Sequence, residues 1–314
     1  MFLKEEIGLL RSRKWKVVLG LLTAVVLAGG FYTYHWYSGV KETFNVSMHQ
    51  KVEAIDSSVT KEKIEKKDPL NVLLLGVDER EGDRGRSDSM MILSLNPGTQ
   101  ETKIISIPRD TRTVMEGNEP EAGRLDKINH AYAFGGTNMS VSTVERFLDI
   151  DLDHYVRVNM EGLAMLVDTV GGITVDNPLD WYDEGDYSEG YHYKEGEITL
   201  DGPQALGYVR MRYEDPNGDA GRNERQRQVI EAILEKGNQI GSVTKLNEFM
   251  SVLGNHVKTD IDLGGARDLF FHYRQASQQI SNYQMTGRDA MIDGIYYLQV
   301  DPQEIDRVHH MIMN

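Results

Sequence analysis

The chain has 314 residues and carries 49 acidic against 34 basic side chains, which gives a formal net charge of -15. This length suffices for one large domain or two small ones. Because the chain has no cysteine, disulfides, a thiolate nucleophile and a cysteine-ligated zinc site are excluded. The acidic balance argues against general binding of nucleic acid, which requires a basic surface.

An uncharged apolar run, residues 17–34, is long enough to cross a bilayer as a helix. Lysines and arginines precede the run, and Trp36 and Tyr37 suit the far membrane interface. We therefore predict a single-pass protein of the cell membrane, with a cytoplasmic basic tail (1–16), a transmembrane anchor (17–37) and an extracellular body. A cleaved signal peptide is the alternative, and we favour the anchor because no small-residue cleavage site clearly follows the run.

A polar, charge-mixed segment follows at residues 38–68 and predicts an extracellular stalk. The folded domain is then expected to span residues 69–314. It opens with NVLLLGV (71–77), a short apolar run typical of a strand that is buried on both faces. Two more strands are expected at 90–96 and 102–108, because an Asn-Pro-Gly turn signal separates them.

Helical and strand patterns alternate through the rest of the chain, which predicts an α/β sandwich with a mixed central sheet. The expected helices are residues 127–134, 138–149, 160–172 (with Gly171 as C-cap), 222–239, 244–257, 264–277 and 302–313. Further strands are expected at 154–159, 173–178 and 294–300. The alternating run YVRMRY (208–213), if extended, places Arg210 and Arg212 on one face.

Residues 176–202 combine nine acidic side chains with a single lysine and with interleaved tyrosines and a tryptophan. This composition predicts a long surface loop or hairpin. A flap that contacts sugars through aromatic faces is the other interpretation.

Five arginines lie between residues 210 and 227 of this acidic chain. Clustered guanidinium groups repel one another unless an anion lies among them, and their planar fork matches phosphate oxygens. Arg222, Arg225 and Gln226 share a face of the first turn of the helix expected there, where a phosphate is favoured and cations are not. A phosphate site is one interpretation, and a solvated basic helix start over an acidic neighbour is the other.

Charged side chains also follow the first three strands. Asp78 ends the first strand and Asp88 precedes the second. Arg86 lies between these two aspartates, and Arg109 comes just beyond the end of the third strand. Ligands of open α/β sheets bind outside the strand ends, and two carboxylates suit Mg²⁺ bridged to phosphates. Aspartate is also an ordinary turn residue, so spacing alone leaves the metal open.

Several motifs in order together resemble the LytR-CpsA-Psr family. They are the runs NVLLLGVDER, GRSDSMMILSLNP, KIISIPRDTRT, DKINHAYAFGG, YVRVNMEGLAMLVDTVGGITVDNP and YVRMRYEDPNGDAGRNERQRQ. They cover about residues 70–240, and we assign no functional residue beyond them. The resemblance implies an α-β-α sandwich with a cleft for a polyprenyl chain. It also implies a phosphotransferase that moves teichoic acid or a similar glycopolymer from polyprenyl pyrophosphate onto peptidoglycan.

The resemblance extends to single positions. It implies that Asp78 and Asp88 bind the metal, Mg²⁺ or Mn²⁺. It implies a set of pyrophosphate-binding residues made up of Arg86, Arg109, Arg210, Arg212, Arg222 and Gln226. Asp219 matches the last motif of the family.

The implied reaction is attack of a peptidoglycan hydroxyl on the glycosyl-side phosphorus, with polyprenyl phosphate as the leaving group. Arg109 and the metal would stabilise charge on the phosphates, and Asp219 or Asp88 would accept the hydroxyl proton, with Asp219 preferred because a metal-bound carboxylate is a poor base. Apolar residues of 138–149 and 160–170 line a lipid cleft or form core. A polyprenyl-pyrophosphate hydrolase and a non-catalytic sensor or scaffold are the alternatives.

Overall fold

The computed structural model describes residues 48–79, 85–188, 190–238 and 253–313. Its centre is a six-stranded sheet with the strand order β11-β6-β1-β2-β3-β12. β1 (Leu70–Val77) lies parallel to β6 (His154–Asn159) and antiparallel to β2 (Ser87–Asn96). β3 (Glu101–Ser106) is antiparallel to β2 and parallel to β12 (Gln279–Gln284). The predicted mixed central sheet is therefore confirmed.

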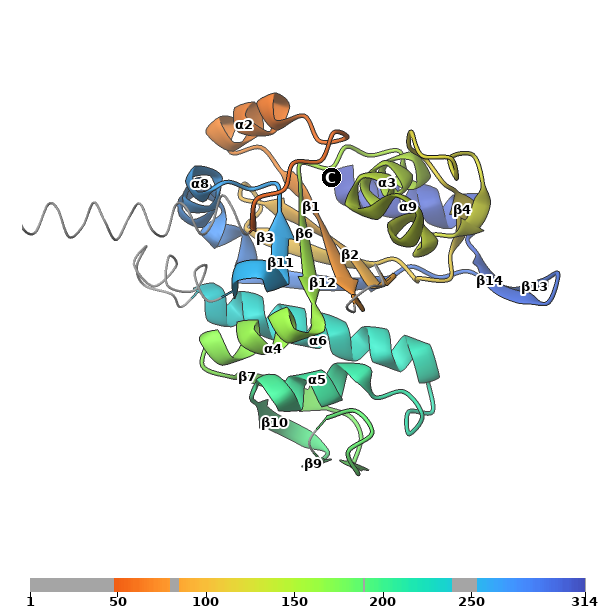
Figure 1. Ribbon diagram of the computed structural model, residues 1–314. Helices are drawn as coiled ribbons and strands as arrows, with labels where there is room; N and C mark the ends of the chain where they lie inside the picture. Colours follow the sequence, from red (N-terminus) through yellow and green to blue (C-terminus); the bar gives the residue numbers. More distant parts are fainter. Residues whose placement is uncertain (1–47, 80–84, 189, 239–252, 314) are drawn as a thin grey trace, which may run out of the picture.

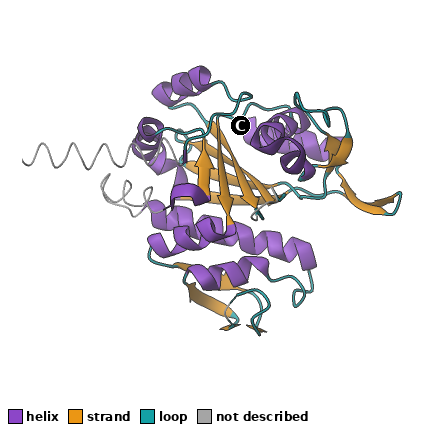
Figure 2. Cartoon of the chain, in the orientation of Figure 1, coloured by secondary structure: helices purple, strands orange, loops and turns teal. Residues whose placement is uncertain are grey.

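Helices cover both faces of this sheet, as Figures 1 and 2 show. α3 (His130–Leu148) and α9 (Pro302–Met313) lie on one face, and α4 (Met160–Thr169) and α6 (Gly218–Asn238) on the other. The remaining elements are α2 (Ser57–Lys66), β4 (Arg112–Val114), β5 (Leu125–Lys127), β7 (Ile173–Asn177), β8 (Trp181–Asp183), β9 (Tyr191–Tyr193), β10 (Gly196–Leu200), α5 (Gly202–Arg210), β11 (Val257–Thr259), α8 (Leu263–Tyr273), β13 (Arg288–Ile292) and β14 (Ile295–Gln299).

The two faces of the sheet differ in how completely they are covered. Towards α3 and α9, Leu73, Leu75 and Tyr155 are at most 1% exposed. Towards α4 and α6, Val72, Met91, Leu93 and Ile104 are buried as well, but a second set of apolar side chains there is only partly buried. This set includes Leu74, Val156, Val158, Met165, Leu166, Ile230 and Leu234. We call this second set the half-buried apolar face. The apolar residues of 138–149 are core, since Met139, Val141 and Val144 are fully buried.

Three of the sequence-based assignments need correction. Residues 208–213 do not form a strand, because α5 continues to Arg210 from a capping box made by Asp201 and Gln204. The helix expected at 127–134 starts only at His130, and it is continued as α3 across a kink at Gly136. Within 244–257, the described part ends in strand β11 instead of helix.

The aromatic segment 176–202 forms two short antiparallel pairs, β7 with β10 and β8 with β9. The hairpin interpretation is therefore confirmed. Trp181 stacks on Tyr193 with ring centroids 4.0 Å apart, and both side chains are buried. These two rings consolidate a small core over α5 and are not presented to a sugar, whereas Tyr182 is exposed.

The predicted boundary between stalk and folded domain at residue 69 is too late. Met48, Val52 and Ile55 are buried in the cores of the domain, and α2 packs beside β1 through Ile64. Residues 38–47, the predicted anchor (17–37) and the tail (1–16) lie outside the described residues. Within the described ranges, no helix has the length and apolarity needed to cross a bilayer.

A matched pair of lysines tests the docking of α2. Lys63 donates to Asp153, a buried carboxylate that also accepts the Asn71 amide, whereas Lys66 pairs with Glu62 on the surface. Lys63→Met should lower the free energy of unfolding by about 1.5–3 kcal/mol, because Asp153 loses its charged partner. Lys66→Met should leave it unchanged, because an exposed ion pair contributes little to stability. Equal effects in urea denaturation would show that α2 is a free stalk.

Candidate active site

The site is built at one edge of the central sheet. β1 ends at this edge, and the antiparallel β2 begins there with Ser87 and Asp88. β3 runs back to the same edge, so that Arg109 and Asp110 emerge beside Asp88. Arg109 Nη1 donates to Asp88 Oδ1 over 3.0 Å. The predicted meeting of Asp88 and Arg109 is thus confirmed by the register of three strands.

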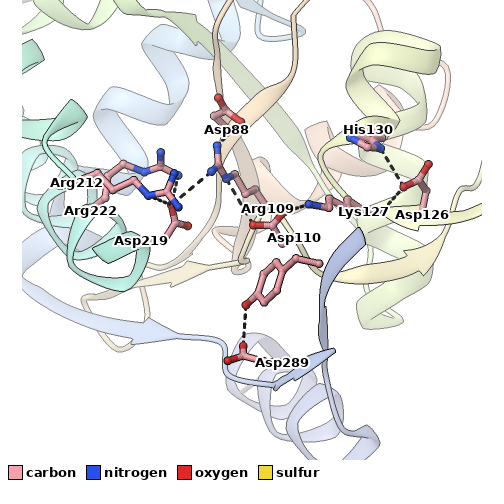
Figure 3. Close-up of polar contacts among 11 residues, drawn as sticks. Asp88, Arg109, Asp110, Asp126, Lys127, His130, Arg212, Asp219, Arg222 and Asp289 are labelled. Carbon is pink, nitrogen blue, oxygen red and sulfur yellow. Dashed lines mark hydrogen bonds and ion pairs between the residues drawn. The ribbon is translucent and has the colours of Figure 1, made fainter. Parts of the chain in front are cut away.

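The start of α6 completes the cluster. Asp219 stands in its first turn, and Arg222 Nη2 reaches Asp219 Oδ1 over 2.6 Å. The same oxygen lies 3.6 Å from Arg109 Nη2 and 3.9 Å from Arg212 Nε. Guanidinium groups from three separate segments therefore converge on one carboxylate, as Figure 3 shows. We call Arg109, Arg212, Arg222 and Asp219 the arginine cluster.

A second acid–base pair flanks the cluster. Asp110 Oδ2 lies 3.7 Å from Arg109 Nε, and Asp110 Oδ1 lies 2.5 Å from Lys127 Nζ. Lys127 comes from β5, next to the ion pair of His130 with Asp126 (Figure 3). Asp110 and Lys127 were not predicted as site residues, although Asp110 lies in the motif run IPRDTRT and Lys127 in the run DKINH. The available signal for Asp110 was its position directly after Arg109.

The pKa values of Arg109 and Arg222, which are both largely buried, shift in opposite directions. Burial alone lowers the pKa of Arg109, but the carboxylates of Asp88 and Asp219 outweigh it and raise the pKa above its ordinary value. For Arg222, burial is the larger effect and lowers the pKa, against the opposing charge of Asp219. Both groups stay charged near neutral pH. Of these two guanidinium groups, Arg222 is the one whose burial is not fully compensated by neighbouring carboxylates.

Two buried polar atoms point to the same conclusion. Arg222 Nε and Gln226 Oε1 are buried, and neither finds a hydrogen-bond partner among the described residues. Buried polar groups in folded proteins are normally paired, so such atoms at a charged edge suggest a ligand. A phosphate accepts from guanidinium groups, and an amide turned over offers its NH₂ in the same place. The donor set fits a phosphate group.

Arg225 and Arg227 are structural, contrary to the expectation for Arg225. Arg225 is fully buried and donates to the Tyr208 and Met211 carbonyls over 3.0 and 2.5 Å and to Asp215 over 2.5 Å. It thereby fastens the α5–α6 connection that presents Arg212. Arg227 binds Ser106, Gln284 and Glu224 in the interior. The solvated-helix interpretation is also incorrect for these two side chains.

Three other predicted site residues do not belong to the arginine cluster. Arg210, at the end of α5, is exposed and donates to the Tyr187 carbonyl over 3.0 Å. Arg86 is exposed, and its charge acts on His130. Asp78 follows β1 at the same sheet edge, with its amide donating to the Arg86 carbonyl over 3.2 Å. Their roles toward phosphate or metal stay predictions.

The sequence profile described as the LytR_cpsA_psr family matches residues 31–313. The chain belongs to this family. The matched residues extend well past the predicted family core of about 70–240, and they include the hairpin β13–β14 and α9.

A curated relative of this LytR_cpsA_psr protein is the polyisoprenyl-teichoic acid–peptidoglycan teichoic acid transferase TagU of Bacillus subtilis, 44% identical over 95% of both chains. The crystal structure of B. subtilis TagU superposes with a TM-score of 0.62 and 42% identity, covering 79% of this chain and 96% of that one. TagT bound to LI-WTA is similar with a TM-score of 0.65 and 28% identity, covering 85% and 95%.

Proposed function

We propose that this protein transfers an anionic glycopolymer, a teichoic acid or a similar polymer, from a polyprenyl-pyrophosphate carrier to a sugar hydroxyl of peptidoglycan. The reaction forms a phosphodiester and releases polyprenyl phosphate. The observation that carries the proposal is the convergence of Arg109, Arg212 and Arg222 on one carboxylate. The similarity to a teichoic acid transferase over 95% of the chain supports the substrate class.

The arginine cluster supplies what transfer of a phosphate group requires. Phosphoryl-type transfer depends mostly on positioning and on stabilising charge that moves onto the leaving phosphate. Arg109 and Arg222 are at most about one-fifth exposed, so their charges act in a partly dehydrated setting where they are strongest. In the free enzyme Asp219 takes the place of the substrate anion. Pyrophosphate would draw the guanidinium groups away from it.

The half-buried apolar face offers a path for the polyprenyl chain. α6 connects the two regions, because its first turn holds Asp219 and Arg222 while Ile230 and Leu234 lie over the sheet. From residue 222 to residue 234 a helix rises roughly 18 Å. A lipid whose pyrophosphate sits in the arginine cluster would therefore extend along α6 and over the paired residues Leu74 and Val156 of the sheet.

The donor set at the sheet edge also fits Mg²⁺, or Mn²⁺. The described residues contain no group of three or more histidine or acidic side chains placed to hold a metal. Mg²⁺ does not need one, since it commonly takes one or two carboxylates together with substrate phosphates and water. Asp78 and Asp88 would hold the ion. When bound, it would neutralise charge on the phosphates.

Asp219 is suited to accept the proton of the attacking hydroxyl. Asp88 is occupied by Arg109 and by its proposed metal, whereas Asp219 is about one-third exposed and stands where the phosphate would bind. Once the phosphate engages Arg222 and Arg212, the carboxylate of Asp219 regains free lone pairs.

The variant Asp219→Asn separates the two proposed roles of this carboxylate, as the counter-ion of the arginine cluster and as the acceptor of the hydroxyl proton. The variant should bind inorganic pyrophosphate more tightly, because three guanidinium groups lose their internal counter-ion, yet its transfer rate should fall roughly 100-fold, because an amide accepts no proton. Calorimetry and single-turnover kinetics measure the two effects. Near-normal turnover of Asp219→Asn would exclude Asp219 as the base and leave Asp88.

The anchor is part of the proposal. An apolar run at residues 17–34 behind a basic tail would hold the enzyme at the membrane that carries its lipid substrate, with the described domain on the outer side. Fusing a reporter that is active only outside the cell to residue 314 checks the orientation. An inactive reporter on a stable fusion would contradict it.

The transferase proposal is tested with the full chain in detergent, a short-chain polyprenyl-pyrophosphate glycan and Mg²⁺. We expect prenyl phosphate release to depend on uncrosslinked peptidoglycan, with the glycan appearing on it. Equal release without the acceptor would show a pyrophosphatase. Binding of the donor without any release would show a scaffold or sensor.

A further inference from the structure

A β-hairpin near the C-terminus, β13–β14, stands beside the arginine cluster. Asp293 and Gly294 form its two-residue turn with φ of 51° and 79°, the left-handed geometry that matches the twist of paired strands. The Leu298 amide donates to the Asp110 carbonyl over 2.9 Å, and Leu298 also forms a parallel bridge with Thr111. The hairpin is therefore fixed to the segment that carries Arg109.

The two tyrosines of β14 point to opposite sides of the hairpin. Tyr297 is buried, with the Arg112 guanidinium 5.5 Å from its ring centroid. Tyr296 is 39% exposed and is paired across the strands with Met291, which is 69% exposed. The Tyr296 hydroxyl donates to Asp289 over 2.7 Å, so a hydrogen bond fixes the exposed ring in place. The result is a small, rigid and accessible aromatic surface.

This surface borders the proposed reaction centre. The ring centroid of Tyr296 lies 5.8 Å from Lys127 Nζ, the partner of Asp110. Burial and Asp289 raise the pKa of Tyr296 to about 12, and the charges of Asp110 and Asp219 add to the shift. In Figure 3, Asp289 lies below Asp110 and Asp219.

We propose that Tyr296, with Asp289 and Met291, forms the subsite for the acceptor, a neutral saccharide strand. The inference rests on the proposed function and adds where the acceptor binds. A flat ring held at the surface stacks on the apolar face of a sugar, and carboxylates accept from its hydroxyl groups. A long polymer also requires an open surface, which the half-buried apolar face does not provide.

Charge distinguishes the acceptor from the donor polymer at this hairpin. The exposed carboxylates of the hairpin are Asp289 and Asp293, and Arg288 is paired with Asp301. The cation beside the ring, Lys127, is neutralised by its ion pair with Asp110. Such a surface repels a polyanion and accepts an uncharged glycan. Tyr213 is even more exposed, at 86%, but it directly follows Arg212, whose guanidinium belongs to the arginine cluster. That cluster suits the anionic donor.

The test compares Tyr296→Ala, Tyr296→Phe and Tyr182→Ala in the full chain. Tyr182 is an exposed tyrosine of β8, outside the arginine cluster, and serves as the control. Tyr296→Ala should weaken binding of an uncharged peptidoglycan glycan fragment, and raise the acceptor KM, by roughly three- to tenfold. The donor KM should stay unchanged. Tyr296→Phe should retain most of the affinity, and Tyr182→Ala all of it.

Unchanged fragment binding by Tyr296→Ala, or an equal rise in the donor KM, would overturn the subsite. The same would follow if Tyr213→Ala and not Tyr296→Ala raised the acceptor KM. Fragment binding by calorimetry requires no turnover. A wild-type protein that binds the fragment through Tyr296 but transfers nothing would therefore refute the proposed function and leave the subsite standing.

Discussion

Arg109→Ala should lower the rate of glycopolymer transfer roughly 100- to 1,000-fold. Arg109 links the two halves of the site, because it contacts Asp88 at the sheet edge and Asp219 at the start of α6. Its truncation removes a bidentate donor and leaves both carboxylates facing the phosphates. Arg109→Lys should recover only part of the rate, since a lysine keeps the charge and not the planar fork. Single-turnover transfer from the prenyl-pyrophosphate donor measures both.

The control for Arg109→Ala is Arg267→Ala, an exposed arginine of α8 that pairs with Asp268 far along the chain from the cluster. It should transfer at the wild-type rate. Thermal unfolding should show that both variants remain folded. A folded Arg109→Ala variant with normal turnover would remove the arginine cluster from the mechanism.

Arg225→Ala should destabilise the fold by about 3–5 kcal/mol, because it leaves the buried carboxylate of Asp215 without its cation. The variant also loses the hydrogen bonds to the Tyr208 and Met211 carbonyls. These bonds hold the connection between α5 and α6. Urea denaturation followed by circular dichroism gives the change in the free energy of unfolding.

Gly221→Ala provides an independent check on Arg225. A Cβ at residue 221 would come within 1.8 Å of Asp215 Oδ2, so the methyl group must displace the carboxylate that binds Arg225. Gly221→Ala should therefore also destabilise the fold, although alanine is the better helix former. A stable Arg225→Ala protein that has lost only pyrophosphate affinity would assign Arg225 to the ligand and contradict its structural role.

The sheet edge of the site was predictable from sequence because local patterns determine it. The apolar run before Asp78 marks a buried strand, and the Asn-Pro-Gly turn makes the next two strands antiparallel. Antiparallel order then brings Asp88 and Arg109 to the same edge. The helix predicted at 222–239 was also found, but it begins earlier, at Gly218, which puts Asp219 and Arg222 in one turn of α6.

Other features depended on tertiary contacts that no local pattern contains. The run 208–213 alternates like a strand, yet packing of Tyr208 and Val209 against α6 favours a helix. Arg222 and Arg225 look equivalent in sequence, and only the buried Asp215 separates their roles. Residues 48–66 are too polar on average to predict their docking. In contrast, the Asp293-Gly294 pair is a local hairpin signal, so the β13–β14 hairpin could have been predicted from the sequence but was not.

The most direct test of the account follows the glycosyl-side phosphorus of the donor. The full chain would be given a prenyl-pyrophosphate glycan labelled with ³²P at that position, together with Mg²⁺ and uncrosslinked peptidoglycan. If the arginine cluster promotes attack at phosphorus, the label moves to peptidoglycan and unlabelled prenyl phosphate is released. Label that stays in the lipid product as prenyl pyrophosphate would mean attack at the sugar carbon, and the proposed phosphotransferase mechanism would be wrong.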